Sequence, residues 1–172
     1  MKTIKLEKGE SFYIGEKCYF ILKGRGIMKY ILSDGKTIVN ECLLEENKII
    51  YNLLTLDSIN KTSLFKNPEG LFKVFEETLI EEIEINSYIK KNLYTQIIES
   101  YILKEMNLIM TSIEYVFFTL KRYSKNNCIS KTVISYDDFN LSRSQFYLVL
   151  KKLKESKLIV EDDRKYILVE ES

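Results

Sequence analysis

Residues suited to recognition of an anionic polymer are concentrated near the C-terminus, in a segment that begins at Ser142. Ser142 precedes Gln145 by three residues, a capping-box spacing that predicts the start of a helix. Apolar residues then recur every three or four positions and predict the buried face of that helix: Phe146, Val149, Leu150 and Leu153. The other side carries hydroxyls and cations, groups that hydrogen-bond base edges and neutralise phosphates.

Two apolar runs after this helix predict the strands of a hairpin. They cover 158–160 and 166–169, and the polar stretch 161–165 between them is suited to the turn. A capped helix followed by such a hairpin is typical of a winged helix-turn-helix, in which the helix enters the major groove and the hairpin tip lies along the phosphates. The expected DNA-binding residues are Ser142, Arg143, Ser144, Tyr147, Leu148, Lys151, Arg164 and Lys165.

Each of these contacts has a plainer alternative. Arg143 could be an ordinary solvated arginine, and Leu148 could be buried against another element. A run of lysines on a helix is often only a solvated face. That alternative applies to Lys151, Lys152, Lys154 and Lys157.

The composition limits the classes of function. The 172 residues have a formal net charge of only +1, so a nucleic-acid site must depend on local charge. Histidine is absent, which excludes His-based acid–base catalysis and His-ligated zinc or haem. Neither a phosphate-binding loop nor a nucleophile elbow is present. We therefore predict that the chain is not an enzyme and holds no cofactor or metal.

The cysteines and the N-terminus predict a cytoplasmic protein. Cys18, Cys42 and Cys128 are far apart and odd in number, which favours free thiols in a reducing compartment. The first residues lack the apolar core of a signal peptide, and no run approaches 18 apolar residues. We expect a soluble chain with no membrane partner.

Residues 1–87 predict a β-roll or jelly-roll barrel. Five of the six glycines separate short strand-like runs there, and Asp34-Gly35 predicts a hairpin turn. The only proline, Pro68, predicts a loop before the last two strands. The aromatic residues of the runs are expected in the barrel core: Phe12, Tyr13, Tyr19, Phe20 and Tyr30.

A long helical pattern follows, and a capping-box match at Thr111 and Glu114 divides it. We predict a connecting helix over 88–110 and a winged helix domain over 111–172, which makes the chain α+β. The connecting helix has more apolar sides than one barrel can cover, so a second copy of the helix is the economical partner. The expected dimerisation residues are Ile98, Ile102, Met106 and Ile109.

The order of barrel, long helix and winged helix resembles the Crp/Fnr family of bacterial transcription regulators. The resemblance is carried by 15–16, 19–26 and 34–36 in the barrel, and by 141–145 and 150–159 in the C-terminal part. It implies a homodimer that binds a pseudo-palindromic operator in double-stranded DNA. It also implies a contact with RNA polymerase.

Departures from the family pattern bear on the effector. Members that bind cyclic nucleotides hold the ribose with the Glu of a Gly-Glu pair and the phosphate with an Arg. The matching region here, about 48–75, has no arginine. The iron–sulfur branch uses four cysteine ligands and the haem branch a histidine, which this chain cannot supply. We therefore expect no response to cyclic nucleotide, and either another small effector or none.

Further departures bear on DNA reading. Relatives show Ser-Arg-Glu at the helix start, with a second Arg four residues after the Glu. Arg143 matches the first Arg, whereas Ser144 and Leu148 replace the other two residues. Leu148 could contact a thymine methyl, so we expect a site rich in A·T pairs.

We predict a homodimeric, sequence-specific DNA-binding regulator with an effector-sensing type of barrel. The alternative is a winged helix protein-interaction module that has lost DNA reading.

Overall fold

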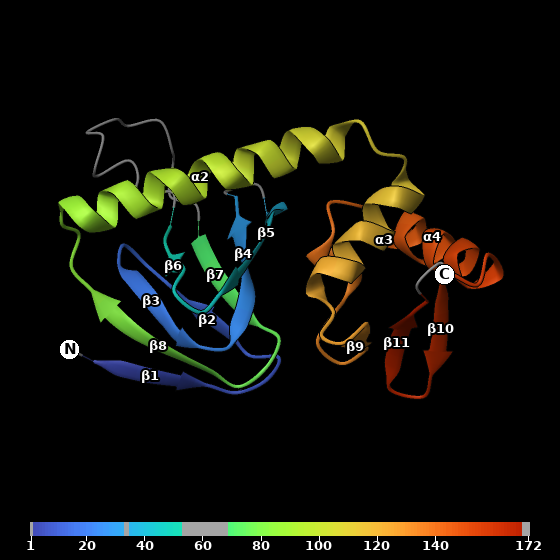
Figure 1. Ribbon diagram of the computed structural model, residues 1–172, viewed down its shortest axis with the longest axis horizontal. Helices are drawn as coiled ribbons and strands as arrows, with labels where there is room; N and C mark the ends of the chain where they lie inside the picture. The colour runs from blue at the N-terminus through green and yellow to red at the C-terminus, as the bar shows by residue number, and fades with distance from the viewer. Residues whose placement is uncertain (1, 33–34, 53–68, 170–172) are drawn as a thin grey trace. The chain divides into compact units, whose positions relative to one another are not determined.

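The computed structural model describes residues 2–32, 35–52 and 69–169 (Figure 1). The chain divides into two compact units, Met1–Leu103 and Lys104–Ser172, and each is described by itself. The predicted turn at Asp34-Gly35 lies partly outside the described residues, and Pro68 lies wholly outside them. The predicted domain boundaries at 87 and 110 remain a prediction.

The first unit contains two four-stranded sheets within the described residues, and all their pairings are antiparallel. One sheet has the order β1 (Thr3–Leu6), β8 (Thr78–Ile83), β3 (Cys18–Lys23), β6 (Ile49–Ile50). The other has the order β2 (Ser11–Tyr13), β7 (Glu69–Val74), β4 (Arg25–Ile31), β5 (Thr37–Glu45). β5 pairs with β4 from end to end.

Both sheets bury alternate residues in one apolar core. Met28 and Tyr30 enter it from β4, and Phe72 and Val74 enter it from β7, as the two-residue period of a strand requires. The other sheet and its connections supply Leu6, Ile14, Tyr19, Ile21, Ile50 and Ile80. The core is therefore closed from two sides.

The prediction that Tyr13 belongs to this core is wrong. Its side chain is 55% exposed. β2 is the end strand of its sheet, and Phe12 packs against the core, so the next residue along the strand must point away from it.

Gly26, one of the glycines in the family-like stretch, lies where β4 and β7 approach closely. A Cβ at this position would overlap the Lys73 carbonyl oxygen and would meet the Phe72 ring at 2.8 Å. Glycine is therefore required for the two strands to pair at this distance.

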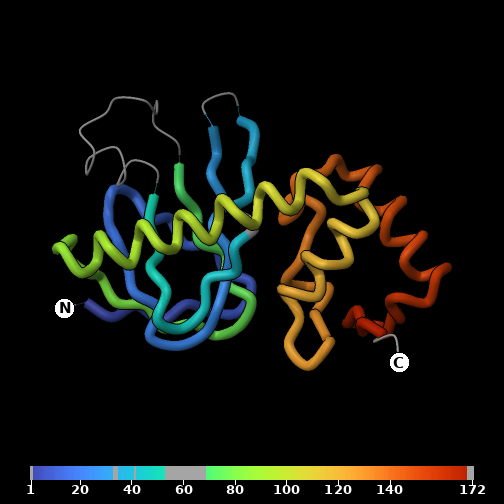
Figure 2. Tube along the Cα trace, turned by 45° about the horizontal axis from the view of Figure 1, so that its top comes forward, coloured from blue at the N-terminus to red at the C-terminus, as the bar shows by residue number. Residues whose placement is uncertain are grey.

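The helix α2 (Ser87–Leu108) lies beside the strands of the first unit (Figure 1 and Figure 2). Ile89 and Leu93 join a second apolar cluster with Cys18, Ile49 and Tyr51. These buried residues recur at helical spacing on one side of α2, so the first turns of the helix complete the packing of the roll.

A pair of hydrogen bonds fastens α2 to the sheet. The Ile49 N–H donates to Gln96 Oε1 at 3.0 Å, and Gln96 Nε2 donates to the Ile49 carbonyl at 2.7 Å. β6 is the end strand of its sheet, so the buried Gln96 amide satisfies backbone groups that a further strand would otherwise pair. An ion pair between Lys48 and Glu99 at 2.6 Å lies next to this contact.

The second unit is built from helices and a small sheet. Its elements are α3 (Ser112–Tyr123), β9 (Cys128–Ser130), the 3-10 helix η1 (Tyr136–Asp138), α4 (Arg143–Glu155), β10 (Ile159–Asp162) and β11 (Lys165–Leu168). The strands form an antiparallel sheet of order β10-β11-β9.

Both predicted capping boxes are confirmed. The Glu114 N–H donates to the hydroxyl of Thr111, and the Thr111 N–H donates to the Glu114 carboxylate at 2.8 Å. Ser142 and Gln145 make the corresponding pair of contacts at the start of α4. The helix α2 ends earlier than predicted, at Leu108, so Ile109 lies just beyond it, three residues before α3 begins.

The core of the second unit is aromatic and centres on Phe139. The Phe139 ring lies 4.6 Å from Phe146, 6.1 Å from Tyr123 and 6.5 Å from Tyr115, measured between ring centroids. All four predicted core residues of α4 are buried: Phe146, Val149, Leu150 and Leu153. Phe139 thus joins α3, η1 and α4 into one packed body.

Two local predictions in the second unit need correction. The hairpin turn consists of Asp163 and Arg164 only, because Glu161, Asp162 and Lys165 continue the strands in paired register. The third strand, β9, is absent from the predicted elements. Its three residues are too few to give a periodic pattern, and it is held by pairing with β11.

Candidate nucleic-acid interface

The outward side of α4 presents every residue of this helix that the sequence predicts to bind DNA. Arg143, Ser144 and Lys151 are exposed, Tyr147 is 51% exposed and Leu148 is 55% exposed. The alternative that Leu148 is buried is therefore wrong. The same helix buries its opposite side against the aromatic core, which fixes the direction in which these side chains point.

Contacts at the start of α4 hold its polar groups in place. The Ser142 hydroxyl accepts from the Gln145 N–H at 3.3 Å and lies 3.3 Å from the Ser144 hydroxyl. The Arg143 guanidinium lies 5.9 Å from the centre of the Tyr147 ring, a cation–π distance. The positive end of the helix dipole also favours an anion here. The first turn thus gathers two hydroxyls and a guanidinium at the positive end of the helix dipole.

The hairpin brings the remaining predicted residues to its tip. Arg164 lies in the turn and Lys165 begins β11, and both are exposed. Three acids precede them directly: Glu161, Asp162 and Asp163. The hairpin therefore carries mixed charge.

Three residues of the hairpin region that the sequence did not mark as a group are joined by ion pairs. Glu161 accepts from Lys131 at 2.7 Å and from Lys154 at 2.6 Å. The hydrogen bond from Lys131, then the one from Lys154, lowers the pKa of the Glu161 carboxyl. No sequence signal could identify Lys131, because it follows the unpredicted strand β9.

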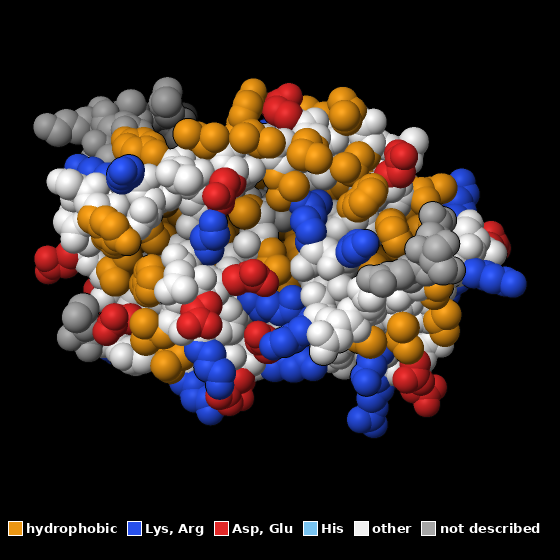
Figure 3. Space-filling view, viewed as in Figure 1, with side chains coloured by type: hydrophobic (Ala, Val, Ile, Leu, Met, Phe, Trp, Pro, Cys, Tyr) orange, Lys and Arg blue, Asp and Glu red, His pale blue; other side chains and the backbone are white. Residues whose placement is uncertain are grey.

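The outward side of α2 is a second candidate surface, with a different chemistry. The predicted dimerisation residues on this helix, Ile98, Ile102 and Met106, are 59%, 54% and 49% exposed. The fourth, Ile109, lies just beyond the end of α2 and is 86% exposed. Tyr94 and Tyr101 are also exposed on this helix, and hydrophobic side chains follow its length (Figure 3). An exposed apolar stripe of this extent is characteristic of a protein interface.

The described side chains from the two sheets of the roll pack against one another in one apolar cluster. The Tyr30 hydroxyl donates to the Tyr51 carbonyl at 3.5 Å, and burial raises the pKa of both phenols, that of Tyr51 to about 12. All three cysteines are free thiols. Within the described chain, no group of acidic or cysteine side chains is placed to hold a metal ion.

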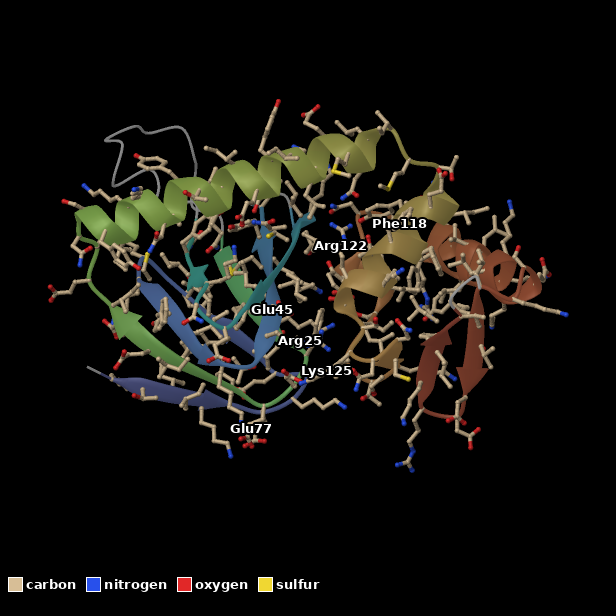
Figure 4. The ribbon with its side chains drawn as sticks, viewed as in Figure 1. Arg25, Glu45, Glu77, Phe118, Arg122 and Lys125 are labelled. Carbon is tan, nitrogen blue, oxygen red and sulfur yellow. The ribbon has the colours of Figure 1, made fainter. Side chains whose placement is uncertain are left out.

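Two arginines have internal partners. Arg25 lies at the start of β4 (Figure 4). Its Nε is 3.9 Å from a Glu76 carboxylate oxygen. Arg122, on α3, donates to Thr119 Oγ1 at 3.1 Å and to Asn107 Oδ1 at 3.4 Å.

The region that matches the cyclic-nucleotide site of the family, about 48–75, lies partly outside the described residues. None of the helices that the structure describes is long and apolar enough to cross a bilayer.

Of the comparisons with known proteins, only the one with solved structures finds matches. No protein-family profile matches the chain, and a search of curated proteins finds no match. Among solved structures, a Crp/Fnr-family transcriptional regulator from Eubacterium rectale aligns with a TM-score of 0.74 and 13% identity, over 98% of this chain and 85% of the other. A CRP-family transcriptional regulator from Thermus thermophilus aligns with a TM-score of 0.70 and 15% identity, over 99% of this chain and 92% of the other.

Proposed function

We propose that this chain, which has the fold of the Crp/Fnr regulators, is a homodimeric, sequence-specific DNA-binding regulator of transcription. In this proposal α4 is the recognition helix and the β10–β11 hairpin is the wing of a winged helix-turn-helix. α2 is the dimerisation helix, and the two-sheet roll is a unit of the effector-sensing type.

The observation that carries the proposal is the division of α4 into two sides. Its apolar residues are buried, while Arg143, Ser144, Tyr147, Leu148 and Lys151 are exposed together. A helix with hydroxyls, cations and one apolar contact on its free side fits a major groove.

Dimerisation would present two copies of α4 to one face of the duplex. In such dimers the recognition helices lie about 34 Å apart and read the two halves of a pseudo-palindrome. The apolar outward side of α2 supplies a surface that a second α2 can cover. Contact with RNA polymerase remains part of the proposal.

The reading chemistry follows from three side chains. Arg143 would contact a guanine edge or a phosphate, and Ser144 would donate to or accept from either base. Leu148 would pack on a thymine methyl, so a site rich in A·T pairs is favoured.

The roll would not respond to cyclic nucleotide. Arg25 is the single arginine before residue 122, and its contact with Glu76 leaves it poorly suited to a phosphate. Tyrosines and aliphatic side chains occupy the core between the sheets.

Fluorescence anisotropy with duplexes from upstream of the chain's own gene tests the proposal. At low salt the unsubstituted chain should bind, and Arg143→Ala should weaken binding by about 5- to 100-fold. Lys91→Ala, which removes an exposed cation from α2 instead, is the matched control and should leave affinity unchanged. Equal binding by all three chains would contradict the assignment of α4.

The three acids of the hairpin favour a second candidate function, a winged helix module that binds a protein instead of DNA. Glu161, Asp162 and Asp163 would repel phosphates if the hairpin approached a duplex. A stoichiometric protein partner in a pull-down, together with no salt-dependent affinity for DNA, would support this candidate.

A further inference from the structure

Glu161 lies at the meeting point of three elements of the second unit. It projects from β10 and pairs through one carboxylate oxygen with Lys131, which follows β9, and through the other with Lys154, in the last turn of α4. The two distances are 2.7 Å and 2.6 Å. A single carboxylate therefore ties the hairpin both to the neighbouring strand and to the helix proposed to read DNA.

Lys131 extends this connection to the hairpin turn. Its backbone N–H donates to the Arg164 carbonyl at 2.9 Å, and its ammonium donates to the Asp163 carbonyl at 3.4 Å. The ammonium also lies 5.4 Å from the centre of the Tyr166 ring. Because Glu161 orients the Lys131 ammonium, it also holds the Asp163 carbonyl of the turn, while the Lys131 backbone N–H holds the Arg164 carbonyl.

The same ion pairs determine whether Lys131 and Lys154 are available to bind the phosphates of DNA. The Lys131, Glu161 and Lys154 side chains are 24%, 37% and 41% exposed, so each is only partly solvated. A lysine paired internally contributes less to the release of counterions from DNA, and that release supplies most non-specific affinity. Glu161 thus reduces the attraction of the unit for any duplex while it orders the hairpin.

We infer that Glu161 is a specificity-determining residue, which positions the hairpin tip for the proper site and keeps Lys131 and Lys154 from binding DNA of any sequence. This inference rests on the proposed function. The inference goes beyond the proposed function because it gives a favourable role to an acidic residue next to the proposed DNA-binding surface.

Glu161→Gln tests the inference, with Asp163→Asn as the matched control. Asp163 lies in the same hairpin, and its backbone carbonyl, not its carboxylate, accepts from Lys131. Affinity is measured against salt for the upstream duplex and for an unrelated duplex of equal length. In Glu161→Gln, affinity for the unrelated duplex should rise about three- to tenfold, with a salt slope steeper by about two, one for each lysine released, and the ratio of specific to non-specific affinity should fall.

Asp163→Asn should raise affinity for both duplexes alike and leave the ratio unchanged. Glu161→Asp keeps the charge but is too short to reach both lysines. It should free one lysine, so the non-specific salt slope should steepen by about half as much as in Glu161→Gln, and specific affinity should fall. If Glu161→Gln changes the ratio no more than Asp163→Asn does, the inference is overturned while the proposed function stands.

Hydrogen exchange of the Lys131 amide gives a readout without DNA. In Glu161→Gln, faster exchange of this amide supports the positioning role, and unchanged exchange overturns the positioning role. If the unsubstituted chain binds no duplex at low salt, the proposed function fails, and the role of Glu161 in specificity fails with it.

Discussion

The outward sides of α2 and α4 follow the same helical period but carry different kinds of residue, mostly apolar on α2 and mostly polar or cationic on α4. α2 exposes isoleucines, a methionine and tyrosines, whereas α4 exposes hydroxyls, an arginine and lysines with one leucine among them. Each helix buries its other side in its own unit. From this difference we propose a different class of partner for each side: another apolar helix for α2 and a polyanion for α4.

The largest effect should come from charging the apolar face. The double substitution Ile98→Glu and Ile102→Glu places two carboxylates on the outward side of α2, and burying them in an interface is costly. The dissociation constant of the dimer should rise by about a thousandfold or more, as measured by analytical ultracentrifugation.

Lys90→Glu is the control for this experiment, because it reverses a charge at an exposed position in the first turn of α2, about two turns before Ile98. It should leave the dimer intact. A double variant that sediments with the same mass as the unsubstituted chain would refute the role given to α2.

The next largest effect should show that the outward sides of α2 and α4 are independent of one another. Phe139→Ala removes the ring on which α3, η1 and α4 converge, so the second unit should lose about 3 kcal/mol or more of stability. Denaturant unfolding followed by amide signals of each unit measures this loss. Dimerisation through α2 should persist, and its disappearance would show that the surfaces depend on one another.

A smaller effect concerns Tyr51, which packs with the buried side of α2, and it should appear at alkaline pH. Burial raises the Tyr51 pKa to about 12, whereas an unfolded tyrosine ionises near pH 10. The stability that comes from the neutral phenol is therefore complete below pH 10 and is lost as the pH rises towards 12. The loss should be about 2–3 kcal/mol.

Tyr51→Phe keeps the ring and removes the ionising hydroxyl, so its stability should fall less steeply over the same pH range. The comparison is a series of urea unfolding curves between about pH 9 and pH 12, a range that spans the two pKa values. Parallel pH profiles for the two chains would show that Tyr51 does not titrate in this way.

The parts of the structure that the sequence predicted are those governed by local rules. The caps at Thr111 and Ser142 depend on two residues three apart, and the buried side of α4 depends on one helical period. Both signals lie within a short stretch of chain, so tertiary contacts did not override them.

The parts that the sequence did not predict depend on distant residues. β9 exists because β11 pairs with it, and Tyr13 is exposed because its strand is at the edge of a sheet. The Glu161 contacts join residues up to thirty positions apart, from Lys131 to Glu161. Since neither partner is unusual in its own stretch, only the folded chain reveals the group.

Amide NMR of the chain titrated with its upstream duplex tests the role of α4 most directly. We predict the largest chemical-shift changes at Arg143, Ser144 and Leu148, with smaller changes at the hairpin turn. Changes confined to other elements, with the α4 amides unmoved at saturation, would contradict the assignment of α4 as the DNA-reading helix.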